Sequence, residues 1–255
     1  MRLRILFLTL VFPALLSAQN SSLSSNGVLR AAYLSSNPAQ AFVDPANGTT
    51  RGVVVDLTDA LGKRLGVAVR LIPARNPQAV IDAVQAGEAD IGYVAYNPER
   101  AGPVEFSKPY MLVHQTFVVR DGSVITSVSN LDRMNQKLGA TKGDSIALYL
   151  ARTLKQAELV ELADSTSAEA FQSLLEGKLD AIGANRQRLT DAIRTRQGFR
   201  VLPDNLYSVE QTIIVGRGKP EGLKALNEFI DEVKRSGVLQ TSIERSGVIG
   251  IGVAP

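Results

Sequence analysis

One pattern of residues occurs twice in this chain and narrows the folds that the chain can adopt. Residues 79–97 read AVIDAVQAGEADIGYVAYN, and residues 169–187 read EAFQSLLEGKLDAIGANRQ. Each copy predicts an amphipathic helix, a Gly that ends it, an Asp three residues later (Asp90, Asp180) and a short buried strand. Because both Asp residues stand at strand starts, we expect them to serve the fold. Copies 90 residues apart suit two similar α/β lobes, and a cleft between lobes can bind a small molecule.

Residues 1–18 have the composition of a signal peptide. Arg2 and Arg4 precede an apolar stretch, 5–16, which small residues follow. About twelve apolar residues that include a proline are too few to span a bilayer comfortably. We therefore expect cleavage near residue 18, a flexible N-terminus over 19–26 and export to the periplasm. No Cys stands at the cleavage point, so we expect no lipoprotein anchor.

The composition excludes several classes of function. The sequence has no Cys and one His, which excludes disulfides, zinc–thiolate sites and thiol nucleophiles. No carboxylate-rich loop resembles a calcium site, and we expect neither a metal nor another cofactor. Removal of the first 18 residues leaves 26 Lys and Arg against 25 Asp and Glu, which argues against nucleic acid as a partner. A mature chain of about 235 residues can bury a sizeable core without disulfides.

Strands and helices alternate along the rest of the chain, which indicates an α/β sheet. Asn76 and Pro77 are expected to begin the first repeat helix, and Thr166 with Glu169 to form a capping box for the second. The patterns predict strands over 28–34, 67–71, 115–119, 137–141 and 212–215, helices over 53–65, 145–154 and 221–235, and a loop over 35–50.

Five longer motifs follow one another along the chain. They are GVVVDLTDALGKRLGV (52–67), AGEADIG (86–92), NPERAGPVEFSKPY (97–110), LGATKGDSIALYL (138–150) and EGKLDAIGANR (176–186). Through these motifs the chain resembles the family 3 extracellular solute-binding proteins, the polar amino-acid receptors of ABC importers, over roughly residues 28–245. Any one motif is weak evidence, but five in this order and spacing are hard to obtain by chance.

The resemblance implies a periplasmic-binding-protein type II fold, an α/β fold in which a two-strand hinge joins two lobes. Lobe 1 is then expected over 27–112 and 212–255, and lobe 2 over 113–211. Ligand binding closes such hinges around the solute.

Arg100 is the first candidate for a ligand-binding residue. Asn97 can cap a helix with Pro98 at its first position, which puts Arg100 beside exposed amides where a carboxylate can bind. In the family, the Arg of this motif holds the α-carboxylate of the ligand. The alternative is a surface Arg paired with Glu99 or Glu105.

The wall beside Arg100 departs from the family pattern. The stretch from Asp90 to Arg100 is two residues shorter than is usual in the family. Because side chains alternate between the two faces of a strand, a deletion of two residues leaves every strand side chain on the same face. Ala95 is an expected pocket residue, and it stands where the family usually has the hydroxyl of a Ser or Thr. Tyr93 and Tyr96 lie nearby, where packing in the core and stacking on the ligand are both open to them.

Lobe 2 is expected to contribute the start of the helix at Asp144 and Ser145. The family commonly has a Thr at the position of Asp144. We expect Asp144 to cap the helix, to touch the ligand or to do both. Asn185 stands where the family has the Asp that binds the α-amino group. The neighbouring Arg186 contacts the ligand or, with Arg188, forms a solvated helix face.

Three further positions bear on the ligand. Leu34 falls where a second common Asp is expected, and Asn37 aligns with a cleft residue or serves only a turn. His114, on the predicted hinge strand, is interpreted as structural. With Leu34 and Asn185 both uncharged, the cleft lacks the carboxylates that usually face an α-ammonium. The expected ligand is therefore an organic acid or a modified amino acid.

These features predict a monomeric, non-enzymatic periplasmic receptor. It captures a small carboxylate-bearing solute (an amino acid, modified amino acid or organic acid) between its lobes and delivers it to an ABC transporter permease. The alternative is an enzyme on the same scaffold, similar to cyclohexadienyl dehydratase. Such an enzyme needs a carboxylic acid that donates a proton, and the position of its Glu is Arg188 here. A receptor-kinase sensor domain is disfavoured because it needs a transmembrane helix.

Overall fold

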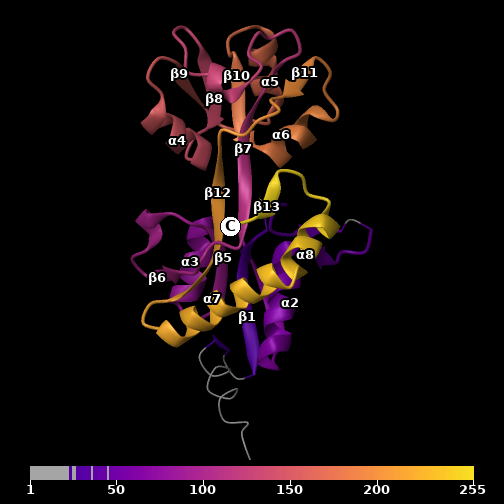
Figure 1. Ribbon diagram of the computed structural model, residues 1–255. Coiled ribbons are helices and arrows are strands. Elements are labelled where there is room, and N and C mark those ends of the chain that lie inside the picture. The colour runs from indigo at the N-terminus through magenta and orange to yellow at the C-terminus, as the bar shows by residue number, and fades with distance from the viewer. Residues whose placement is uncertain (1–22, 25–26, 36, 45) are drawn as a thin grey trace, which may run out of the picture.

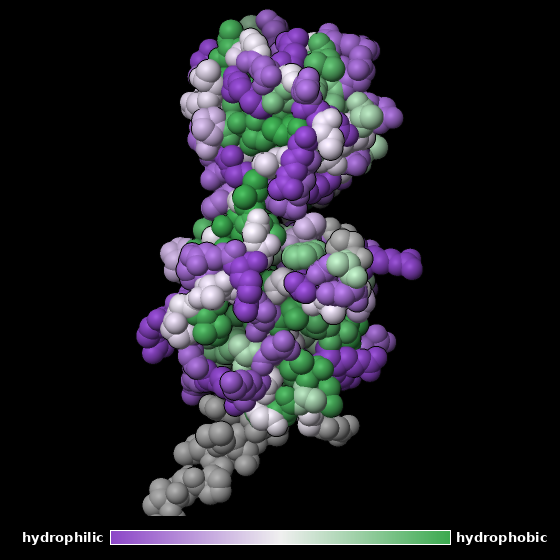
Figure 2. Space-filling model, turned by 90° about the vertical axis from the view of Figure 1, so that its right-hand side faces the viewer, coloured by the Kyte–Doolittle hydropathy of each residue, from purple (hydrophilic) through white to green (hydrophobic). Residues whose placement is uncertain are grey.

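A computed structural model describes residues 23–24, 27–35, 37–44 and 46–255. The predicted signal peptide over 1–18 and most of the predicted flexible N-terminus lie outside these residues. The described residues form two α/β lobes that two long strands connect (Figure 1), and the surface narrows between the lobes (Figure 2). The predicted α/β fold class, with two lobes that two strands connect, is confirmed.

The helices and strands are named as in Figure 1. The strands are β1 (Val28–Leu34), β2 (Phe42–Val43), β3 (Thr50–Arg51), β4 (Ala68–Ala74), β5 (Ile91–Ala95), β6 (Val104–Phe106), β7 (Met111–Arg120), β8 (Lys137–Thr141), β9 (Glu158–Leu162), β10 (Ala181–Asn185), β11 (Phe199–Val201), β12 (Tyr207–Gly216) and β13 (Ile251–Val253). The helices are α2 (Val53–Leu65), α3 (Pro77–Gln85), α4 (Ser145–Thr153), α5 (Ala168–Leu175), α6 (Arg186–Ile193), α7 (Pro220–Arg235) and α8 (Val238–Ser246), with short 3₁₀ helices η1 (Pro98–Arg100) and η2 (Val128–Asn130).

One sheet runs through both lobes in the strand order β4-β1-β5-β12-β7-β10-β8-β9. In lobe 1, β1 pairs in parallel with β4 and β5, and in lobe 2, β8 pairs in parallel with β9 and β10. The strands β7 and β12 are antiparallel to each other and to their neighbours β10 and β5. The predicted lobe boundaries near 112 and 212 fall inside these two strands and stay predictions.

The parallel sheet of lobe 1 is covered by helices on both faces, as the alternation of side chains along β1 requires. Leu29, Ala31 and Tyr33 belong to a buried cluster with α2 and α7, whereas Ala32 and Leu34 belong to a second cluster with α3. Lobe 2 has its own two buried clusters, one with α4 and one with α5 and α6. Each lobe therefore has a separate core.

The two repeated Asp residues perform the same structural task in the two lobes. Asp90 precedes β5, and its carboxylate accepts a hydrogen bond from the backbone N–H of Arg30 at 2.8 Å. Asp180 precedes β10 and accepts from the backbone N–H of Lys137 at 2.8 Å. Each Asp N–H also donates to the carbonyl oxygen of the same partner residue. The predicted structural role of both residues is confirmed.

The ends of the repeat helices agree with the sequence in one copy and differ by a residue in the other. Asn76 accepts from the N–H of Ala79 at 2.9 Å and Pro77 follows it, as predicted. The second helix is capped by Ser167, which accepts from the N–H of Ala170 at 3.1 Å. The predicted cap at Thr166 is therefore wrong, because its hydroxyl donates instead to the carboxylate of Asp164.

Other differences concern the length and number of elements. The strands β7 and β12 extend well beyond the predicted 115–119 and 212–215, because each crosses from one lobe to the other. The predicted loop over 35–50 contains the small β2–β3 pair. The C-terminal residues add α8 and β13, which pairs with β7 beside the hinge.

Gly92 in β5 tests how closely the repeat helix packs on its strand. A Cβ at Gly92 would lie 2.6 Å from Cγ1 of Val80 and 3.0 Å from Cγ2 of Val84, both on α3. We expect Gly92→Ala to lower the free energy of unfolding by about 1–3 kcal/mol, because the added methyl group overpacks this contact. Denaturant unfolding measures the change.

Gly122→Ala is the matched control, since a Cβ there meets nothing within 4 Å. We expect its unfolding free energy to stay within about 0.5 kcal/mol of wild type. Equal stability of the two variants would contradict the close packing of α3 on β5.

Candidate functional site

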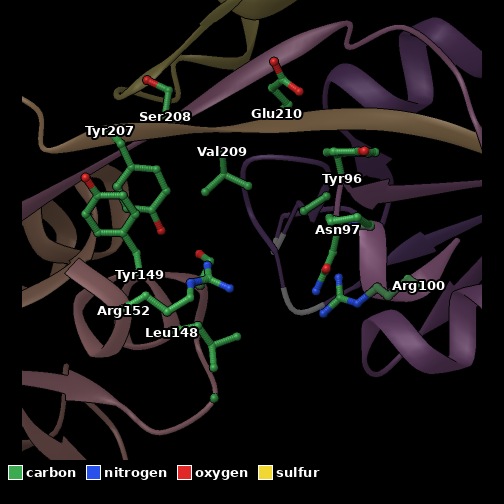
Figure 3. Close-up of a pocket in the computed structure, with 14 residues that line it drawn as sticks. Tyr96, Asn97, Arg100, Leu148, Tyr149, Arg152, Tyr207, Ser208, Val209 and Glu210 are labelled. Atoms are coloured by element: carbon green, nitrogen blue, oxygen red, sulfur yellow. The ribbon is translucent and has the colours of Figure 1, made fainter.

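A cavity of about 400 Å³ lies between the lobes, where the hinge strand β12 passes (Figure 3). Its walls come from three parts of the chain that are far apart in sequence. Lobe 1 contributes the end of β5 and the turn after it, lobe 2 contributes the start of α4, and β12 lies along one side. The lining residues are Ala95, Tyr96, Asn97, Pro98, Arg100, Gly143, Ser145, Leu148, Tyr149, Arg152, Tyr207, Ser208, Val209 and Glu210.

The lobe 1 wall brings Arg100 to the cavity through a single tight turn. The N–H of Arg100 donates to the carbonyl oxygen of Asn97 at 3.0 Å, and Pro98–Arg100 form one 3₁₀ turn. A helix does begin after Asn97 with Pro98 at its first position, as predicted, but it is a single 3₁₀ turn and not a longer α-helix. One turn provides no helix dipole of useful size, so Arg100 can act through its guanidinium alone.

The lobe 2 wall is one face of α4. Ser145, Leu148, Tyr149 and Arg152 follow the i, i+3, i+4, i+7 spacing that places side chains on one side of a helix. The amides at the start of α4 lie beside Ser145 and give this wall hydrogen-bond donors for an anion.

Asp144 precedes this face but does not line the cavity. It is the N-cap residue of α4, yet its side chain makes no capping hydrogen bond. Its carboxylate accepts from Nη1 of Arg188 at 3.0 Å, and Arg188 also binds Asp164 at 3.2 Å. The side chain of Asp144 is therefore engaged in an ion pair within lobe 2.

Two tyrosine rings form an apolar side of the cavity. Tyr149 on α4 and Tyr207 on β12 stack with their ring centroids 4.3 Å apart and their planes 13° from parallel (Figure 3). Burial raises the pKa of Tyr207 to about 12, so its hydroxyl is neutral at physiological pH. This pair can cover the carbon skeleton of a small ligand.

Of the eight predicted site residues, the cavity brings together Ala95, Arg100 and Ser145. Tyr93 is fully buried in lobe 1, with its hydroxyl 3.1 Å from that of Thr58, and Asn37 accepts from the N–H of Ala39 at 3.1 Å in a turn. Neither lines the cavity. For Tyr93 the structure therefore favours core packing over stacking on a ligand.

Asn185 and Arg186 also make structural contacts rather than lining the cavity. Asn185 caps α6 by accepting from the N–H of Arg188 at 2.8 Å. The guanidinium of Arg186 donates to the carbonyl oxygen of Asp204 at 2.7 Å and to Oδ1 of Asn205 at 2.8 Å. Ligand contact at these two positions, as at Asn37 and Asp144, stays a prediction.

Sequence reasoning missed several lining residues. Tyr149 and Arg152 could have been found, because their spacing from Ser145 on a predicted helix places them on one face. Tyr207 and Glu210 gave no comparable signal, since the predicted strand began only at 212. Within the described ranges, no three or more His, Asp or Glu side chains group as a metal site, and no helix is long and apolar enough to cross a membrane.

Two lobes around one cavity, joined by two strands, define a two-lobed solute-binding protein. Comparison with known proteins gives the family: the family model described as bacterial extracellular solute-binding proteins, family 3, matches residues 29–246. This chain belongs to the bacterial extracellular solute-binding proteins, family 3. The predicted role as a solute-binding protein of an ABC importer is thereby confirmed.

Individual relatives agree with this assignment. The L-cystine-binding protein TcyJ of Escherichia coli (strain K12) is 25% identical, over 78% of this chain and 75% of that protein. A putative ABC transporter binding component from Wolinella succinogenes, complexed with lysine, is 26% identical with a TM-score of 0.69, over 87% of this chain and 96% of that chain. The ancestral amino-acid-binding protein AncCDT-1, a precursor of cyclohexadienyl dehydratase, is 28% identical with a TM-score of 0.64, over 86% and 95%.

His114 links the two hinge strands beside the cavity. Its ring atom Nδ1 lies 2.7 Å from the hydroxyl of Ser208, the residue paired with it on β12. The backbone N–H of His114 donates to the carbonyl oxygen of Gly250. Burial lowers the pKa of His114, and the nearby positive charge of Arg186 lowers it further.

A lowered pKa makes the folded protein bind this proton less readily than the unfolded chain does. The contribution of His114 to stability is thus present above its ordinary pKa of about 6.5 and is lost as pH falls through the lowered value. We expect the denaturation midpoint of wild type minus that of His114→Gln to decrease when the pH is lowered from about 7.5 to about 5. A difference that stays constant with pH would contradict the burial of this ring.

Proposed function

We propose that this protein captures a small carboxylate-bearing solute between its lobes and delivers it to the permease of an ABC importer. The observation that carries this proposal is the single cavity that Arg100 lines from lobe 1 and the start of α4 lines from lobe 2. A guanidinium donates two parallel hydrogen bonds to a carboxylate, and the N–H groups at a helix start donate hydrogen bonds to the same kind of anion. Relatives named for L-cystine, glutamine and arginine support a ligand of this size and charge.

We further propose that the ligand is an organic acid or a modified amino acid. Leu34 and Asn185 are uncharged, and Asn185 is already engaged as the cap of α6. Two carboxylates could replace the missing negative charge: that of Asp144 binds Arg188 at 3.0 Å, and that of Glu210, a lining residue, lies on the side of β12 opposite Val209, whose side chain points into the cavity (Figure 3). An α-ammonium group enclosed without an acceptor charge would be costly, so an unmodified polar amino acid is disfavoured.

The proposal includes the export and assembly of the chain. The composition of residues 1–18 supports cleavage by a signal peptidase and release into the periplasm as a protein without a lipid anchor. A monomer is proposed, because closure of two lobes of the same chain forms the site without a second copy. Rotation about β7 and β12 is the proposed closing motion.

We propose that the protein has no enzymatic activity. The position at which a cyclohexadienyl dehydratase has its proton-donating Glu is Arg188, and its guanidinium is bound to Asp144 and Asp164. An Arg at this position cannot act as the carboxylic acid that the dehydration requires. Similarity to AncCDT-1, described as a precursor of that enzyme, makes the alternative a specific one to test.

Incubation with prephenate and arogenate separates the receptor from the enzyme. We expect no phenylpyruvate or phenylalanine to form at a rate above that of the buffer, because no proton donor occupies the required position. Chromatography of the reaction mixture measures the products, and a cyclohexadienyl dehydratase serves as the positive control. Formation of product that depends on the protein would overturn the receptor proposal.

Arg100→Ala tests the carboxylate anchor. We first identify a ligand by thermal shift against amino acids, keto acids and dicarboxylic acids, since a ligand at 100 times its Kd stabilises a protein by about 2.7 kcal/mol. We expect Arg100→Ala to weaken binding of that acid by about 2–5 kcal/mol, or roughly 30- to 5000-fold, because the carboxylate loses its charged partner. Calorimetry measures the affinity.

Arg245→Ala is the control for this experiment. Arg245 binds Asp56 at 3.0 Å and neither residue lines the cavity, so its loss removes the same charge without removing a lining residue. We expect its affinity to remain within about threefold of wild type. An Arg100→Ala affinity within that same range would show that the carboxylate is held elsewhere.

A further inference from the structure

Apolar side chains gather where lobe 2 and the hinge strand border the cavity. Leu148 and Tyr149 come from α4, and Tyr207 and Val209 come from β12 (Figure 3). We propose that these four residues form an apolar subsite and that the ligand is a carboxylic acid with a branched aliphatic or aromatic side group. This inference rests on the proposed function and names the class of ligand more narrowly.

Two large apolar side chains that line the cavity are exposed, one from each lobe. Leu148 of lobe 2 is 43% exposed, and Tyr96 of lobe 1 is 48% exposed. The ring of Tyr96 meets that of Phe106 edge to face with the centroids 5.2 Å apart, which supports it from lobe 1. Single exposed apolar residues are ordinary, but apolar residues that gather around one hollow indicate a binding surface. A hydrocarbon group of the ligand fits such a surface.

The spacing along α4 separates the anion end of the cavity from the apolar end. Ser145 lies at the amides that begin the helix, and Leu148 follows three residues later, about 4.5 Å along the helix axis. Tyr149 comes next, and its ring stacks on that of Tyr207 with the centroids 4.3 Å apart. A carboxylate bound at the helix start therefore leaves a side group of ordinary amino-acid length beside Leu148 and the stacked rings.

The charged residues nearby leave this apolar wall intact. Arg152 follows Tyr149 by three residues and is exposed, so its guanidinium can stay in water while its methylene groups extend the wall. Glu210 is exposed too, and it lies on the side of β12 opposite Val209 (Figure 3). A polar side group bound here would lose water without gaining a partner from Leu148 or Val209, whereas an apolar group is stabilised by leaving water.

The test compares acids of matching shape and charge whose side groups differ in polarity. The pairs are 4-methylpentanoate with succinamate, 4-methyl-2-oxopentanoate with 2-oxosuccinamate, N-acetyl-L-leucine with N-acetyl-L-asparagine, L-leucine with L-asparagine, and 3-phenylpropanoate with its pyridin-4-yl analogue. Calorimetry measures the affinity of wild type for each. We expect at least one apolar member to bind about tenfold or more tightly than its polar partner.

Two substitutions change the polarity of the wall and keep its shape. Leu148→Asn should lower that ratio about fourfold or more, the effect of one methylene group or more leaving apolar contact. Val209→Thr should lower the ratio as well, and it keeps the test decisive if Leu148→Asn fails to fold. Leu148→Met retains an apolar side chain and should keep the wild-type preference.

Leu175→Asn is the matched control. Leu175 is 48% exposed at the end of α5 in the same lobe, and it does not line the cavity. The same change in polarity at this position should leave the ratio of affinities at its wild-type value. A ratio lowered equally by Leu148→Asn and Leu175→Asn would overturn the apolar subsite.

The neutral primary amide of the preferred apolar acid separates this inference from the proposed function. It keeps the apolar group and removes the negative charge, so we expect it to bind about tenfold or more weakly than the acid. Equal binding of acid and amide would overturn the carboxylate receptor and leave the apolar subsite in place.

The remaining outcomes concern the apolar subsite itself. Polar members that bind as tightly as their apolar partners in every pair would overturn it and leave the carboxylate receptor in place. A preference that survives both Leu148→Asn and Val209→Thr would do the same. Absence of binding by every acid in the panel would overturn both proposals.

Discussion

The antiparallel pairing of β7 with β12 is the constraint on which the rest of this structure depends. Five residue pairs, from Tyr207 opposite Gln115 to Gln211 opposite Met111, bridge the space between the two cores. Beside Val113, Leu112 and Met111 the ribbon has β13 as a third strand, and only the part nearer lobe 2 lacks this strand, which makes that part the place where we expect the proposed rotation. Because Tyr207 and Val209 also line the cavity, the proposed rotation would move part of the wall of the candidate site.

The same pairing explains which parts of the fold the sequence could predict. The repeat was predictable because its signals are local: an amphipathic helix, Gly87 or Gly177 in the left-handed conformation, and an Asp that binds the next strand. The hinge strands were predicted too short, because they bury polar residues that break the apolar pattern. In the missed part of β12, the buried Gln211 accepts through Oε1 from Nε2 of Gln40 at 3.3 Å, and in the missed part of β7, Nδ1 of His114 lies 2.7 Å from the hydroxyl of Ser208. Only tertiary contacts satisfy these groups, and a sequence does not display them.

The candidate site divides in the same way. Arg100 and Ser145 lie in motifs whose spacing places them at the ends of elements, so the sequence could predict both. The helical spacing from Ser145 could also have predicted that Arg152 lies on the same face of α4. The position of Tyr207 depends on how far β12 extends, and the burial of Tyr93 on its contact with Thr58, which lies 35 residues away in the chain. Residues placed by long-range packing were the ones that the motifs missed or misplaced.

Arg188 connects two properties that would otherwise look unrelated. It stands where the resemblance to cyclohexadienyl dehydratase places a proton-donating Glu, and it binds the carboxylate of Asp144 at the start of α4. Its second partner, Asp164, holds the guanidinium from the other side. These side chains are one third to one half exposed, so water and salt screen their charge, and the pair is worth little as a source of stability. Its effect is positional: the carboxylate of Asp144 is held in an ion pair within lobe 2 and does not line the cavity.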